Sequence, residues 1–253
     1  MPGTVLAGRY LLDVLRSEAT ISNAGAMQFD ATDLSSTNLV SVRVAPLSRL
    51  VDPLLGSTTS SDAFAIFEAQ CELAESLSHP CIETIYDHGD ATLDGERYVF
   101  TVAERLAGGS LREFLDRGRR LTPSQALIVG IDVCRALDAA AKQGIVHGDI
   151  RPSRLVFGLD RRVRLVGFGA PLRPVDSLNL DQARYSAPEL AEGSPRTGSS
   201  DVYGLALVLV EAMTGEVPFT ADTVAAAFAN RTDKLLPVSA DFGALAQVLE
   251  RAG

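Results

Sequence analysis

The residues best suited to chemistry gather in one stretch, Ile145–Pro171, which reads IVHGDIRPSRLVFGLDRRVRLVGFGAP. Two short apolar runs separated by a charged reversal predict a loop, a strand, a turn, a second strand and a second loop. The polar side chains lie at the loop ends, where a rigid scaffold commonly positions catalytic groups. Asp149 is the carboxylate of the first loop.

The order of residues in this stretch resembles the catalytic segment of eukaryotic-like protein kinases, in which an HRD-x-K-P-x-N loop precedes a β-hairpin and DFG. The counterparts are His147-Gly148-Asp149-Ile150-Arg151-Pro152-Ser153-Arg154 and Gly167-Phe168-Gly169. The resemblance makes Asp149 the catalytic residue, which accepts the hydroxyl proton of the substrate. Both positions that would ligate magnesium differ, because Arg154 is a cation and Gly167 has no side chain. We therefore predict no metal site.

The resemblance also implies a nucleotide site made of a glycine-rich loop, a strand lysine and the hinge between two lobes. The loop counterpart, residues 15–29, contains a single glycine, Gly25. It cannot bring bare backbone against phosphate along its whole length. Arg43 stands at the lysine position, and Glu104 and Leu106 lie in the hinge counterpart. These three residues could form a site that binds ATP weakly and without magnesium. No other cofactor is expected.

The resemblance covers essentially the whole chain and predicts an α+β, bilobed protein-kinase-like fold. A β-rich N-lobe, residues 1–103, carries one helix of the αC type at about 62–77. A mainly α-helical C-lobe, residues 104–253, stops before the last helices of the family, and the two lobes form one domain. The helix from about Ser200 to Thr214 is apolar nearly all round, which predicts burial on every side. The resemblance makes Asp201 in this helix an acceptor of hydrogen bonds from the catalytic-loop backbone.

A second long helix is predicted to begin near Thr122. Thr122 and Gln125 form a capping box, and Pro123 suits the first helical position. The apolar pattern of this helix predicts a buried face that includes Leu127 and Val133.

Composition restricts the partners and the compartment. The net charge of −9 and the sequence pI of about 4.9 argue against a nucleic-acid or anionic-membrane surface, since both require excess positive charge. The cysteines, Cys71, Cys81 and Cys134, lack the paired spacing of a disulfide framework or a zinc site. No signal peptide or run of about 18 apolar residues is present. We predict a cytoplasmic protein with a protein partner.

Taken together, the substitutions predict a pseudokinase. On this interpretation the chain is a catalytically impaired protein kinase homologue of a bacterial, actinobacterial type. It is not an enzyme, and it acts in signalling as a scaffold or regulator. An active, atypical serine/threonine protein kinase remains an alternative. So does a small-molecule phosphotransferase, because HGD also opens the catalytic loop of aminoglycoside- and choline-type kinases.

We also expect the domain to be part of a longer chain, one that can carry a membrane anchor elsewhere. In the resemblance, Glu189 of the Ala187-Pro188-Glu189 motif pairs with an arginine from a segment that would follow residue 253.

Overall fold

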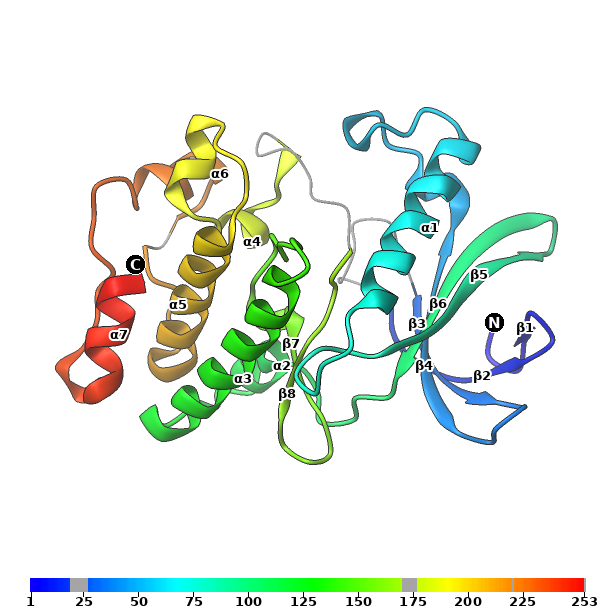
Figure 1. Ribbon diagram of the computed structural model, residues 1–253, viewed down its shortest axis with the longest axis horizontal. Coiled ribbons are helices and arrows are strands. Elements are labelled where there is room, and N and C mark those ends of the chain that lie inside the picture. The colour runs from blue at the N-terminus through cyan, green and yellow to red at the C-terminus, as the bar shows by residue number, and fades with distance from the viewer. Residues whose placement is uncertain (19–26, 170–176, 220, 253) are drawn as a thin grey trace. The chain divides into compact units, whose positions relative to one another are not determined.

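The computed structural model describes residues 1–18, 27–169, 177–219 and 221–252, and the chain forms two units (Figure 1). The N-terminal unit comprises Met1–Ser78, Glu83–Ala107 and Phe168–Pro171, and the C-terminal unit comprises His79–Ile82, Gly108–Gly167 and Leu172–Gly253. Gly25, which carries the prediction about the glycine-rich loop, lies outside the described residues.

The N-terminal unit is built on an antiparallel sheet with the strand order β1-β2-β3-β4-β6-β5 (Figure 1). The strands are β1 (Val5–Leu6), β2 (Tyr10–Glu18), β3 (Met27–Asp33), β4 (Leu39–Pro46), β5 (Ile85–Leu93) and β6 (Glu96–Glu104). Side chains alternate between the two faces of a strand. Val40, Val42 and Val44 of β4 therefore enter one core together with Phe100 and Val102 of β6. The β-rich N-lobe predicted from the sequence is confirmed.

One long helix, α1 (Ser60–Ser76), accompanies the sheet, after the 3-10 turns η1 (Leu47–Leu50) and η2 (Pro53–Leu55). The helix begins with a capping box. The Thr59 hydroxyl accepts from the Asp62 amide at 3.1 Å, and the Asp62 carboxylate accepts from the Thr59 amide at 2.9 Å. The helix therefore starts slightly before the predicted residue 62, because its cap lies outside the apolar pattern.

The C-terminal unit is mainly helical. Its helices are α2 (Leu111–Asp116), α3 (Pro123–Ala141), α4 (Leu180–Ala183), α5 (Gly198–Thr214), α6 (Val224–Ala229) and α7 (Ala244–Ala252). Its strands β7 (Leu155–Phe157) and β8 (Val163–Leu165) form the hairpin predicted after the catalytic loop, and its 3-10 turns are η3 (Pro152–Arg154), η5 (Pro188–Glu192) and η6 (Ala240–Phe242). No helix in the described part of the chain is both long and apolar enough to cross a membrane.

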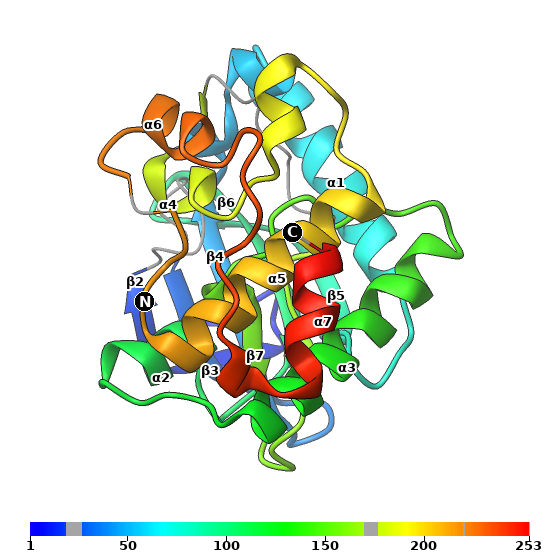
Figure 2. The ribbon, with the colours of Figure 1, turned by 90° about the vertical axis from the view of Figure 1, so that its left-hand side faces the viewer.

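Helix α5 is the central post of this unit and lies between α3 and α7 (Figures 1 and 2). Most of its residues are buried, which confirms the prediction from its uniform apolarity. A side chain at Gly130 of α3 would place its Cβ 3.1 Å from Leu209 of α5, so glycine permits the close approach of the two helices. Leu127, predicted on the buried face of α3, is instead 47% exposed.

Candidate active site

The backbone of the catalytic loop is held by a carboxylate at the start of α5. The amides of His147 and Gly148 donate to the two oxygens of Asp201, at 2.9 and 2.7 Å. This is the role predicted for Asp201. Burial raises the pKa of Asp201 to about 6, even though the two amide bonds favour its charged form.

His147 connects the catalytic loop to Val166, the residue that follows β8. Its side chain is buried, its Nδ1 accepts from the Asp149 amide at 3.2 Å, and its Nε2 lies 3.1 Å from the Val166 carbonyl. The proton therefore sits on Nε2, which donates to that carbonyl. Burial, followed by the charge of Arg154, lowers the pKa of His147 to about 4. His147 is thus a neutral spacer that fixes the backbone of Asp149.

The Asp149 carboxylate is clamped by two arginines of its own loop. Its Oδ2 accepts from Arg154 Nε at 2.8 Å and Nη2 at 2.6 Å, and its Oδ1 lies 3.1 Å from Arg151 Nε. The side chains of Asp149, Arg151 and Arg154 are only 13%, 6% and 8% exposed. Burial pushes the pKa of Asp149 upward, but the charges of Arg154 and Arg151 outweigh it and hold this pKa below its usual range. Asp149 is therefore ionised.

The Arg154 guanidinium also lies next to Gly167, the position at which the kinase pattern has an aspartate. Gly167 has a φ of +95°, and a Cβ there would lie 2.9 Å from Arg154 Nη1 and 3.2 Å from Arg154 Cζ. The guanidinium thus occupies the space that an aspartate at position 167 would need. Arg154 and Gly167 looked like independent losses in the sequence. In the fold the two positions are adjacent, because a side chain at position 167 would require the Arg154 guanidinium to shift.

This arrangement does not fit a magnesium ion. Mg²⁺ requires oxygen ligands in an octahedral shell at about 2.0–2.1 Å. Gly167 offers no side-chain oxygen, Arg154 is itself a cation, and Asp149 already accepts from both arginines. No group of three or more potential His, Cys, Asp or Glu ligands occurs among the described residues.

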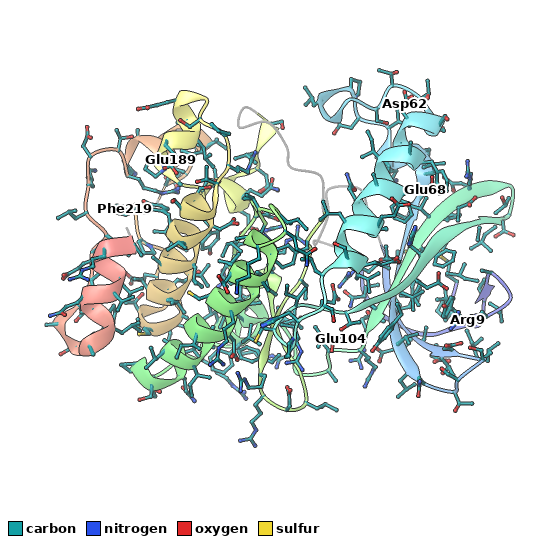
Figure 3. The ribbon with its side chains drawn as sticks, viewed as in Figure 1. Arg9, Asp62, Glu68, Glu104, Glu189 and Phe219 are labelled. Atoms are coloured by element: carbon teal, nitrogen blue, oxygen red, sulfur yellow. The ribbon has the colours of Figure 1, made fainter. Side chains whose placement is uncertain are left out.

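Asp181 of α4 is a site residue that the sequence did not reveal. Its carboxylate pairs with Arg151 Nη1, so Arg151 bridges Asp149 and the segment that precedes Ala187-Pro188-Glu189. The sequence did contain a signal for this pair. Asp181 is an acid in the counterpart of the activation segment, and Arg151 stands at the lysine position of the catalytic loop. Glu189, labelled in Figure 3, forms no ion pair within the described ranges, and its predicted arginine partner stays a prediction.

The three residues predicted to bind a nucleotide lie in the N-terminal unit, but the sheet does not place them all on one face. Arg43 of β4 pairs with Glu83, a buried acid that precedes β5. Burial disfavours the charge of Arg43, but Glu83 outweighs it and raises the pKa of Arg43. Glu104, at the end of β6 (Figure 3), lies opposite Val40 and hence on the other face of the sheet from Arg43. Its carboxylate accepts from the Thr84 amide at 3.0 Å, and Leu106 is half-buried beyond the strand.

These features define a protein-kinase-type domain, and comparison with known proteins agrees. Residues 58–247 match the protein kinase domain family, so this chain belongs to the protein kinase family. It is 33% identical over 183 residues to the serine/threonine-protein kinase PknB of Mycobacterium tuberculosis, which is 69% of this chain and 29% of that protein. It is 31% identical over 228 residues to a probable serine/threonine-protein kinase of Corynebacterium efficiens, which is 87% of this chain and 33% of that protein. The chain spans about a third of the length of these curated relatives.

The prediction that the chain is not an enzyme is wrong. The matches connect it to serine/threonine protein kinases, and nothing in the comparisons indicates lost activity. Missing side-chain ligands for a metal do not by themselves mean missing catalysis. In the fold, Arg154 places a positive charge beside Asp149, at the position where the family has a metal-binding asparagine.

Proposed function

We propose that this chain is the kinase domain of a serine/threonine protein kinase with an atypical catalytic centre. Its substrates would be a nucleoside triphosphate and the serine or threonine hydroxyl of a partner protein. Membership of the protein kinase family and the names of the relatives support this class of reaction. The observation that carries the proposal is the ionised Asp149, fixed on a loop that Asp201 and His147 hold in place.

The reaction would be one in-line transfer. The substrate hydroxyl oxygen forms a bond to the γ-phosphorus, while the bond from that phosphorus to the oxygen bridging the β-phosphate breaks. The hydroxyl proton passes to Asp149, and a nucleoside diphosphate leaves. Oδ1 is the suitable acceptor, because both Arg154 bonds go to Oδ2 and only Arg151 lies against Oδ1.

The lowered pKa makes Asp149 a weak base, and this is compatible with phosphoryl transfer. The transition state is loose, so positioning and electrostatic stabilisation contribute more than proton abstraction. Arg154 and Arg151 supply positive charge directly beside the carboxylate. A partner protein is required here as the substrate, and the overall negative charge of the chain favours a substrate with basic residues near the hydroxyl.

The test is transfer of radiolabelled phosphate from ATP to a generic serine- and threonine-containing protein. We expect the wild type to exceed Asp149→Asn by about 10²-fold or more, the usual contribution of a general base. Lys142→Asn, which removes an exposed charge on the same unit, serves as the matched control and should behave as the wild type. Equal transfer by the wild type and a folded Asp149→Asn variant would contradict the proposal.

A further inference from the structure

Arg154 is a buried cation whose position is fixed from two sides. On one side its Nε and Nη2 lie 2.8 and 2.6 Å from Asp149 Oδ2. On the other side its Nη1 lies 2.9 Å from the position that a Cβ would take at Gly167, whose positive φ of +95° also disfavours a side chain. The residue is 7% exposed, so water screens its charge poorly. A fixed, weakly screened charge is what electrostatic catalysis requires.

A divalent ion and the Arg154 guanidinium exclude each other at this position. A metal bound to Asp149 would share the oxygen that already accepts two N–H groups of Arg154, so the two positive charges would lie within a few ångströms. Gly167 contributes no side-chain oxygen that could offset the repulsion, and Arg151 adds a further positive charge at Oδ1. The guanidinium, in contrast, needs no ligands beyond those it already has.

We propose that Arg154 is the resident cation of this site, and that it replaces a divalent metal ion in neutralising the phosphate groups of the nucleotide. The inference rests on the proposed function only for the identity of the anion. It predicts that the site rejects divalent metals and that nucleotide binding needs none. It further predicts that exchanging Arg154 and Gly167 together, and neither one alone, creates a metal site.

The first experiment measures metal binding without nucleotide, by the electron paramagnetic resonance signal of free Mn²⁺. We expect the wild type to bind no Mn²⁺ above the level of Lys142→Asn, a surface-charge control. The double variant Arg154→Asn/Gly167→Asp, which places two oxygen-bearing side chains beside Asp149, should bind Mn²⁺ at least tenfold more tightly. The Arg154→Asn single variant should show little gain, because position 167 still lacks a ligand.

A matched glycine separates metal binding from backbone strain. Gly193 also has a positive φ, +81°, but a Cβ there would meet nothing within 4 Å. Gly193→Asp therefore adds the same acid in a similar conformation away from Arg154, and should leave Mn²⁺ binding unchanged. If the double variant is unfolded by circular dichroism, Arg154→Gln/Gly167→Asn provides oxygen ligands with less charge. Wild-type binding as tight as that of a folded double variant, or no gain in the double variant, would overturn the proposal.

The second experiment measures ATP binding by calorimetry in excess EDTA and in excess magnesium. We expect wild-type Kd values within about twofold of each other, whereas the double variant should bind more tightly only with magnesium. A wild-type Kd at least tenfold lower with magnesium, or no ATP binding in either buffer, would overturn the proposal. Because neither experiment measures transfer, an inactive wild type that still rejects Mn²⁺ and binds ATP in EDTA would refute the proposed function alone.

Discussion

Asp201 and Asp149 serve the same loop, yet their environments act on them in opposite directions. Asp201 accepts from two neutral backbone amides, and burial raises its pKa to about 6. Asp149 accepts from two guanidinium groups, which outweigh burial and hold its pKa below the usual range. Both side chains are nearly removed from water. The difference therefore comes from the charge of the donors.

The comparison separates the support of the site from its chemistry. The support consists of Asp201 and His147, which bind backbone groups and would hold the loop whatever reaction it performed. The chemical part consists of Asp149, which matches the family pattern, and of Arg154 and Gly167, which depart from it. A site can thus keep its backbone frame while the charges around the reacting group are exchanged.

The largest effect is expected from a substitution that removes the support of the catalytic loop. Asp201→Ala leaves the amides of His147 and Gly148 buried without an acceptor, and each such group costs about 1–3 kcal/mol. We expect the free energy of unfolding, measured with urea at pH 4, to fall by about 2–5 kcal/mol. Asp201→Asn keeps one side-chain oxygen as an acceptor and should lose roughly half as much. A loss below about 1 kcal/mol for Asp201→Ala would show that the loop does not depend on these bonds.

The next prediction uses the pH dependence of stability. The folded-state pKa of Asp201 is raised, so its ionisation makes folding less favourable as pH rises from about 4 to 6. The folded-state pKa of His147 is lowered to about 4, so its contribution improves as pH rises from about 4 to 6.5. The two contributions oppose each other in the wild type.

Asp201→Asn removes one of these opposing contributions. Its unfolding free energy should therefore rise with pH between 4 and 6.5 more steeply than that of the wild type. The extra rise should be about 3 kcal/mol, since each pKa unit corresponds to about 1.4 kcal/mol. Urea unfolding at intervals of half a pH unit measures the effect. Parallel curves for the two proteins would contradict the opposite assignment of Asp201 and His147.

The smallest expected effect on stability concerns the contact between Gly167 and Arg154. Gly193→Ala should cost about 1 kcal/mol, the strain of a non-glycine residue at positive φ. Gly167→Ala adds a Cβ 2.9 Å from Arg154 Nη1 and should cost about 1 kcal/mol more, because the guanidinium must shift from its position beside Asp149. Thermal melting of both variants gives the difference. Equal losses would mean that Arg154 and Gly167 are not coupled.

Local sequence patterns determined most of the scaffold. The apolar runs around the charged reversal gave the β7–β8 hairpin, and the Thr122–Gln125 capping box gave the start of α3. The uniform apolarity of α5 predicted its burial, and the resemblance then supplied the role of Asp201, which the structure confirms. These features depend on neighbouring residues or on the position of a motif, and both are visible in the amino-acid sequence.

Other features were decided by tertiary structure, because their partners lie far apart in the sequence. Arg43 pairs with Glu83, 40 residues away, and Arg151 pairs with Asp181, 30 residues away. Leu127 fits the apolar period of α3, yet it is half exposed. The sequence alone showed that positions 154 and 167 lack a side-chain oxygen that could ligate magnesium. Only the fold showed that the Arg154 guanidinium fills the space beside Gly167 and binds Asp149, because the hairpin β7–β8 brings the two ends of that segment together.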